Sequence, residues 1–143
     1  MAAEVVSRAP AVVLHIEDDA AVRGSVAALL KAAGHTVLSA ADGSDALQIV
    51  LSQRIQPDVL IVDFDLPGEM DGTEAAEAIC GALRHAIPVV LLTGVLTQAA
   101  LPWMPVAPIF CAWKPIAPEV LLKVVESFAD LGRFVRAHIP GAQ

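Results

Sequence analysis

The chain has 143 residues, of which 56% are hydrophobic and 17% charged, and its formal net charge is −7. This length suits one domain with a substantial core, and no apolar run reaches the roughly 20 residues that a membrane-spanning helix needs. The negative charge argues against sequence-independent nucleic-acid binding, which requires a basic surface, and residues 1–10 lack the apolar segment of a secretory signal. We expect a cytoplasmic protein that contacts neither nucleic acid nor membrane directly.

The first half of the chain alternates between strand and helix patterns. An apolar run at 11–16 predicts a strand, and residues 35–40 alternate in polarity as a second strand would. Asp42-Gly43-Ser44 predicts the start of a helix over 45–55. The helix between the two strands is indicated by apolar residues at helical spacing and ends before Gly34; these residues are Val22, Val26, Leu29 and Leu30.

The second half continues the alternation around a third strand at 59–62. Its four apolar, mostly β-branched residues lie between Pro57-Asp58 and Pro67-Gly68, which is typical of a strand buried on both faces. Further patterns predict a helix at 73–83, strands at 88–93 and 109–113, and an amphipathic helix at 117–135 with Pro118 in its first turn. Five strands alternating with helices predict one doubly wound α/β domain with a parallel sheet.

The segment between the fourth and fifth strands departs from this pattern. Three prolines, Pro102, Pro105 and Pro108, follow Thr97, and a proline inside a helix costs about 3 kcal/mol. We therefore predict a short or broken fourth helix. The domain is expected to span residues 11–136, between a flexible N-terminal tail at 1–10 and a C-terminal tail at 137–143.

Asp63 ends the third strand, where an acid has either of two roles. In open parallel sheets the carboxyl ends of the strands face the crevice where ligands bind, so Asp63 is a candidate functional residue. The alternative is that the acid turns the chain before Pro67-Gly68, a role that suits Asp65 better.

Four of the five predicted strands end in polar residues: Glu17-Asp18, Asp63, Thr93 and Lys114. All four strand ends lie on one edge of a parallel sheet. Three carboxylates that meet there repel one another unless a cation lies among them, and ligands that are all oxygen suit Mg²⁺ or Mn²⁺ rather than zinc. A divalent ion beside a carboxylate, a hydroxyl and a lysine indicates phosphoryl transfer onto Asp63.

Other metal-ligating residue types are assigned to the core. His15 falls inside the first strand and is predicted to be a core histidine. Cys80 and Cys111 lie in apolar surroundings without the spacing of a metal site, so they are predicted to be core residues rather than a disulfide or a ligand pair.

From about residue 12 to 128 the chain resembles the receiver domain of two-component response regulators. An acidic pair follows the first strand in this family, and the phosphorylated Asp precedes a Leu-Pro and then an Asp-Gly. Thr or Ser ends the fourth strand, and Lys-Pro ends the fifth. The matching segments are Val13-Leu14-His15-Ile16-Glu17-Asp18, Asp63 to Gly72, Leu92-Thr93-Gly94 and Trp113-Lys114-Pro115. The resemblance implies a flavodoxin-like fold.

The resemblance also implies roles at the acidic residues. Asp63 would accept the phosphoryl group, and Asp18 and Asp63 would bind Mg²⁺ directly, with Mn²⁺ able to substitute. Glu17 would act mainly through water, and the backbone carbonyl of Asp65 would be a further ligand. An Arg usually lies five residues after the second acid of the pair. Arg23 therefore selects Glu17 and Asp18 as the pair and leaves Asp19 as a helix cap.

Lys114 would hold a phosphoryl oxygen, with the Lys114-Pro115 bond cis, and Thr93 would bond to the phosphoryl group after transfer. The implied partner is a sensor histidine kinase or a histidine phosphotransfer protein. The implied output is protein-protein contact, and the only expected catalysis is Mg²⁺-dependent self-phosphorylation. The insertion Gly68-Glu69 resembles receivers of hybrid sensor kinases or stand-alone receivers. The cognate kinase, the target and the oligomeric state stay open, a homodimer included.

One departure from the family and two alternative functions remain. Cys111 occupies the position, three residues before Lys114, where the family usually has an aromatic, and Phe110 should face the other side of the sheet. The first alternative is a haloacid-dehalogenase-like phosphatase, with Asp63 as nucleophile and Asp65 as general acid. The second is a binding-only pseudo-receiver in which the switch is lost.

Overall fold

Five parallel strands form one sheet in the computed structural model, which describes residues 9–94 and 109–138. The strand order is β2-β1-β3-β4-β5. The strands are β1 (Val12–Ile16), β2 (Thr36–Ala40), β3 (Val59–Asp63), β4 (Val89–Thr93) and β5 (Ile109–Trp113). The helices are α1 (Ala20–Ala32), α2 (Gly43–Gln53), α3 (Gly72–Leu83) and α4 (Pro118–His138). The predicted doubly wound, five-stranded, flavodoxin-like architecture is confirmed.

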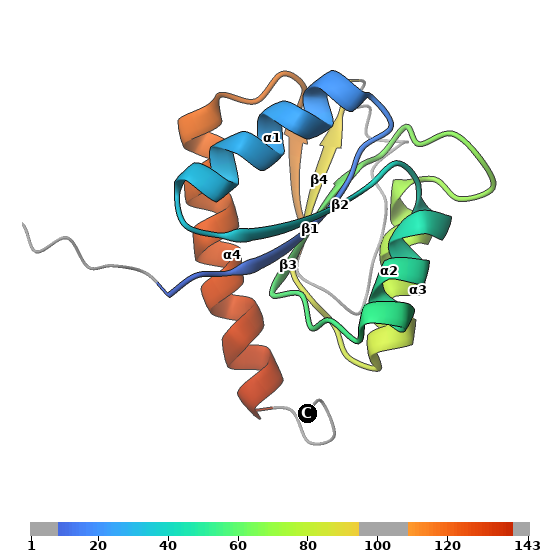
Figure 1. The fold of residues 1–143 in the computed structure, drawn as a ribbon, viewed down its shortest axis with the longest axis vertical. Coiled ribbons are helices and arrows are strands. Elements are labelled where there is room, and N and C mark those ends of the chain that lie inside the picture. Colours follow the sequence, from blue (N-terminus) through green and yellow to red (C-terminus); the bar gives the residue numbers. More distant parts are fainter. Residues whose placement is uncertain (1–8, 95–108, 139–143) are drawn as a thin grey trace, which may run out of the picture.

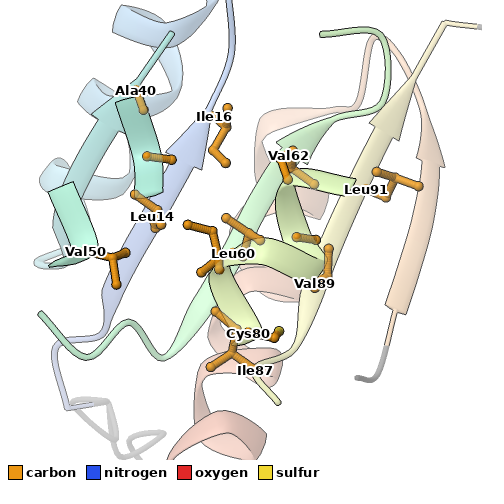
Figure 2. Packing of buried hydrophobic residues seen from close by; sticks show 14 residues of the cluster. Leu14, Ile16, Ala40, Val50, Leu60, Val62, Cys80, Ile87, Val89 and Leu91 are labelled. Atoms are coloured by element: carbon orange, nitrogen blue, oxygen red, sulfur yellow. The ribbon is translucent and has the colours of Figure 1, made fainter. Parts of the chain in front are cut away.

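Helices cover both faces of the sheet, with α1 and α4 on one side and α2 and α3 on the other (Figure 1). All residues of β3 and β4 are buried, because apolar side chains on both faces can pack under helices. Figure 2 shows Leu14, Leu60 and Val89 of three adjacent strands together with Cys80 of α3 in one apolar cluster. Burying each large apolar side chain contributes about 1.5–3 kcal/mol, which holds the strand ends in place.

Aspartates begin three of the helices. The carboxylate of Asp19 accepts hydrogen bonds from the backbone N–H groups of Ala21 and Val22, so the predicted helix cap is confirmed. Asp42 caps α2. Asp71 and Glu74 form a reciprocal capping box at the start of α3, directly after the loop that follows Asp63.

The helix ends differ from their predicted positions by a few residues. The second helix ends at Gln53 rather than at residue 55, because Arg54 adopts a left-handed conformation with φ of 51°. The last helix continues through His138, three residues beyond its predicted end. Its final turns are held by ion pairs from Arg133 and Arg136 to the buried Asp58, at 3.6 and 3.0 Å, contacts that helical periodicity cannot reveal.

The predicted short or broken helix between residues 97 and 108 lies outside the described residues, as do most of the predicted tails. The domain limits therefore stay a prediction. Among the described helices, none combines the length and the apolar composition that crossing a bilayer requires.

Candidate functional site

The carboxyl edge of the sheet brings together the residues that the strand ends predicted. Ile16 pairs with Val62, so the residues that follow them in the chain, Glu17 and Asp63, lie side by side. On the other side of β3, Asp63 pairs with Leu92 of β4, one residue before Thr93. The backbone N–H of Lys114 donates to the carbonyl of Thr93 over 2.8 Å, which carries the lysine to the same edge.

Lys114 joins the acids of two strands. Its Nζ donates to Asp63 Oδ2 over 2.8 Å and to Glu17 Oε1 over 3.0 Å. Asp63 is 5% exposed and Glu17 is 1% exposed, so both carboxylates have lost most of their water. The Lys114-Pro115 peptide bond is cis, as predicted. The ammonium group of Lys114 thus offsets the repulsion between these two buried acids.

Asp18 completes a group of three acids. Oxygen atoms of Glu17, Asp18 and Asp63 lie within 4.8 Å of one another, and Asp18 is the exposed member. The turn that carries the pair is held by Arg23, whose guanidinium donates to the backbone carbonyl of Glu17 over 2.8 Å and to that of Asp18 over 3.3 Å. Arg23 thus holds the turn of the acidic pair in addition to marking it by its spacing in the sequence.

The loop after β3 fixes the second oxygen of Asp63. Asp63 Oδ1 accepts a hydrogen bond from the backbone N–H of Asp65 over 3.0 Å, while the side chain of Asp65 is exposed. Gly72 begins α3 against this loop and donates its N–H to the Phe64 carbonyl over 3.0 Å. A Cβ at Gly72 would lie 2.7 Å from Phe64 Cα, so only glycine allows this approach.

Glu17, Asp63 and Lys114 change one another's pKa values. Burial, and then the hydrogen bond shared with Asp63, raise the pKa of Glu17 to about 7. Burial alone would raise the pKa of Asp63, but hydrogen bonds, led by that of Lys114, outweigh it and hold the pKa below its ordinary value. The same two acids raise the pKa of Lys114 against the effect of its burial. Asp63 is therefore ionised at neutral pH and Lys114 is charged.

The donor set fits a hard divalent cation. Glu17 Oε2 is buried and has no hydrogen-bond partner within the described part of the protein, which costs free energy unless a ligand or a proton satisfies it. Carboxylate oxygens beside an exposed acid, open to water, are the ligands that Mg²⁺ and Mn²⁺ prefer.

Residues around the site face the directions that strand alternation predicted. Cys111 packs against the cluster under α2 and α3, whereas Phe110 lies on the opposite face, with its ring centroid 6.3 Å from that of Phe128. His15 is 2% exposed, and Cys80 is buried, so both core assignments are confirmed. Both cysteines are free thiols.

Two features of the site were not predicted from the sequence. The first is the bridge from Lys114 to Glu17, because residues 97 apart along the chain give no local signal. The second is the environment of the His15 ring, two residues before Glu17 in the chain. Its Nδ1 is buried without a hydrogen-bond partner in the described ranges, and burial, with smaller contributions from nearby Arg23 and Lys114, lowers its pKa to about 4.

Comparisons with known proteins agree with this geometry. A family model described as response regulator receiver domain matches residues 13–126. The transcriptional regulatory protein AfsQ1 of Streptomyces coelicolor is 40% identical over 82 residues, which are 56% of this chain and 33% of that protein. The response regulator MprA of Mycobacterium ulcerans is 38% identical over 84 residues, 57% of this chain and 33% of that protein. The chain thus spans about a third of the length of these relatives.

Solved structures show the same fold. The chemotaxis protein CheY4 of Vibrio cholerae superposes with a TM-score of 0.68 at 30% identity, over 84% of this chain and 99% of that one. The receiver domain of the hybrid histidine kinase CckA superposes with a TM-score of 0.68 at 34% identity, over 82% of this chain and 98% of that one. None of these similarities favours the phosphatase or the pseudo-receiver alternative.

Proposed function

Because this chain belongs to the response regulator receiver domain family, we propose that it accepts a phosphoryl group on Asp63. The donor would be a phosphohistidine on a sensor histidine kinase or on a histidine phosphotransfer protein. One observation carries the proposal: the ionised carboxylate of Asp63 lies 2.8 Å from the ammonium group of Lys114, within a group of three acids that fits a divalent cation.

In the proposed reaction an Asp63 carboxylate oxygen forms a bond to phosphorus while the phosphorus–nitrogen bond of the phosphohistidine breaks. The electron pair of that bond returns to the imidazole. The protein stabilises the negative charge that is spread over the transferred oxygens rather than forming further covalent bonds. Lys114 is suited to this task, since its ammonium already faces Asp63 Oδ2 and can follow a phosphoryl oxygen there.

The acidic residues would hold the metal around this centre. Asp18 and Asp63 would be direct ligands, the backbone carbonyl of Asp65 a third, and Glu17 would act through a bound water. The ion would supply positive charge beside the transferred oxygens and relieve the repulsion among the acids. The buried Glu17 Oε2 and the short loop from Asp63 to Asp65 support this assignment.

Modification would be converted into a surface change at the end of β4. A phosphoaspartate adds roughly 1 to 2 negative charges, which the hydroxyl of Thr93 would meet by donating a hydrogen bond. Thr93 is buried at the strand end, one residue beyond the partner of Asp63. The output would be contact with another protein. Because Cys111 replaces the usual aromatic, we propose that other side chains near Thr93 pass the signal on.

Phosphorylation by acetyl phosphate with Mg²⁺, followed by intact mass spectrometry, tests the proposal. The wild type should gain one phosphoryl group, and Asp63→Asn should gain none. Asp65→Asn is the matched control. The carboxylate of Asp65 is exposed, and only the backbone carbonyl of this residue is assigned to the site. Full labelling of Asp63→Asn would overturn the assignment. Continuous release of phosphate that Asp65→Asn abolishes would favour the phosphatase instead.

A further inference from the structure

Of the three carboxylates in the candidate metal group, two are held by hydrogen bonds. Lys114 donates to Glu17 Oε1 and to Asp63 Oδ2, and the backbone N–H of Asp65 donates to Asp63 Oδ1. The carboxylate of Asp18 is exposed, and no hydrogen bond or ion pair within the described ranges holds it. The direction in which the Asp18 carboxylate points therefore depends on the conformation of its backbone.

One side chain holds the backbone of Asp18 from both sides. Arg23 Nη1 donates to the carbonyl of Glu17 over 2.8 Å and to the carbonyl of Asp18 over 3.3 Å. The first carbonyl belongs to the peptide group before the Asp18 Cα, and the second belongs to the peptide group after it. Because each peptide group is planar, holding both carbonyls restricts both backbone dihedral angles of Asp18 and thus the direction of its Cα–Cβ bond.

The start of α1 places Arg23 for this contact (Figure 1). The backbone N–H of Arg23 donates to the Asp19 carbonyl over 2.9 Å in the first turn of the helix. Helical side chains tilt toward the N-terminus of their helix, so Arg23 reaches back to the carbonyls that precede α1. The two ends of the turn are held separately, by the bond from the Glu17 N–H to the Ala40 carbonyl and by the Asp19 cap. Arg23 supplies the restraint between them.

The charges around Arg23 offer it other partners. Asp18 and Asp19 are exposed acids in the turn that it holds, and the exposed Asp45 lines the same surface hollow as Arg23. None of the ion pairs formed among the described residues includes Arg23. Hydrogen bonds from a charged donor are stronger than those between neutral groups, so a guanidinium that bonds two carbonyls is an effective clamp on the backbone.

We propose that Arg23 is a positioning residue of the magnesium site, which holds the turn so that the Asp18 carboxylate faces Glu17 and Asp63 before the ion binds. This inference rests on the metal binding in the proposed function and assigns a task to a residue that is not one of the proposed ligands. Freeing the backbone of one residue lowers the population of a given conformation by roughly fivefold to thirtyfold. Loss of Arg23 should therefore weaken the binding of Mg²⁺ by about tenfold.

The sign of this effect separates positioning from electrostatics. The positive guanidinium lies near the site and repels Mg²⁺. If its charge were its only influence, removing Arg23 would tighten the binding of Mg²⁺, and most strongly at low salt. Positioning predicts weaker binding, with a difference between the variant and the wild type that changes little with salt.

Calorimetric titration of the full, unphosphorylated chain with Mg²⁺ tests the proposal. Arg23→Met should raise the Kd by about tenfold. Arg23→Lys keeps a charge and a donor on a shorter side chain, so its Kd should lie between those of Arg23→Met and the wild type. Arg136→Met is the matched control, because the Arg136 guanidinium also donates to a backbone carbonyl, that of Gln56 over 3.3 Å, before the start of β3 rather than after its end. Its Kd should equal that of the wild type, and circular dichroism establishes that all variants fold.

A double-variant cycle tests whether Arg23 acts through Asp18. In the Asp18→Asn background, Arg23→Met should change the Kd by less than about twofold, because the carboxylate that Arg23 positions is gone. The rate of phosphorylation by acetyl phosphate is a second readout. Arg23→Met should need more Mg²⁺ for its half-maximal rate and should reach the wild-type rate at saturation, as expected for a residue that affects only metal binding.

Four results would overturn the positioning role. They are an Arg23→Met variant that binds Mg²⁺ at least as tightly as the wild type, an equal loss in Arg136→Met, losses that multiply in the double variant, and a rate that stays low at saturating Mg²⁺. A wild type that binds no Mg²⁺ would instead refute the metal site of the proposed function itself, and the positioning role with it.

Discussion

Thr93 and Trp113, the last residues of β4 and β5, are paired in register, so their side chains start from the same face of the sheet. Thr93 is 3% exposed, whereas Trp113 is 57% exposed. The aromatic that the family usually carries two residues earlier is Cys111 here. A tryptophan at the surface therefore lies next to the hydroxyl that is proposed to engage the phosphoryl group.

Fluorescence of Trp113 should report phosphorylation. The chain has two tryptophans, so Trp103→Phe isolates the signal of Trp113. Adding acetyl phosphate and Mg²⁺ to this variant should change the intensity or the wavelength of the emission, because Thr93 moves beside the ring. The same experiment in Trp103→Phe with Asp63→Asn should show no change. An unchanged emission spectrum in fully phosphorylated protein would show that the surroundings of Trp113 do not change on phosphorylation.

Asp18→Asn should weaken the binding of Mg²⁺ by at least about tenfold, since even outer partners of metal ligands cause losses of that size. Asp19→Asn is the matched control, because asparagine caps a helix as well as aspartate does. Thermal unfolding with and without Mg²⁺ measures both. If Asp19→Asn proved the weaker binder, the acidic pair would be shifted by one residue.

Lys114→Met should destabilise the metal-free protein by about 2 kcal/mol at pH 8, less than for a fully buried pair because the lysine side chain is 30% exposed. Removing the ammonium takes away the largest contribution that lowers the pKa of Asp63, so we expect burial to raise this pKa above its ordinary value. Protons are then bound more tightly in the folded state, so the loss should be smaller at pH 5 than at pH 8. Urea unfolding at both pH values checks this, with Lys31→Met, an exposed lysine, as control.

His15→Leu should change the acid stability of the protein. The pKa of His15 is lowered from 6.5 to about 4 by burial, so the unfolded chain binds a proton that the folded chain does not. His15 therefore reduces stability as the pH falls from 6.5 toward 4, by about 3 kcal/mol at the lower limit. The raised pKa of Glu17 acts in the opposite direction over much of this range.

The difference between the wild type and His15→Leu isolates the histidine from Glu17. As the pH is lowered from 6.5 to 4, the free energy of unfolding of the variant should increase steadily relative to that of the wild type. Urea titrations of the metal-free proteins measure it. A difference that does not depend on pH would show that His15 titrates normally in the fold.

Gly72→Ala should destabilise the protein by about 2 kcal/mol and slow phosphorylation, because the added Cβ collides with the loop that holds Asp63. Gly81→Ala lies in the same helix, where an added Cβ would meet no atom within 4 Å outside the neighbouring helix backbone, so it should stabilise the protein by about 0.5–1 kcal/mol. Chemical denaturation distinguishes the two. Equal changes in stability for the two variants would show that the close approach at Gly72 does not constrain the fold.

The strands and helices could be predicted because their signals are local. The apolar run before Asp63, the Asp-Gly at the start of α3 and the periodicity of α4 each depend on neighbouring residues. The convergence of Glu17, Asp63 and Lys114 followed as well, since the ends of parallel strands share one edge. Helix ends were less well predicted, because Arg54 and the pairing of Arg136 with Asp58 decide them through conformation and distant contacts.

Residue types and their spacing were thus enough to predict the fold class and the group of side chains at the edge of the sheet. The packed chain alone showed that Lys114 bridges two acids, that Arg23 holds their turn, and that α4 has an apolar side turned to solvent. Pairwise distances and burial depend on segments far apart in sequence. Periodicity along the chain does not reveal which apolar side chains of α4 become buried and which stay exposed.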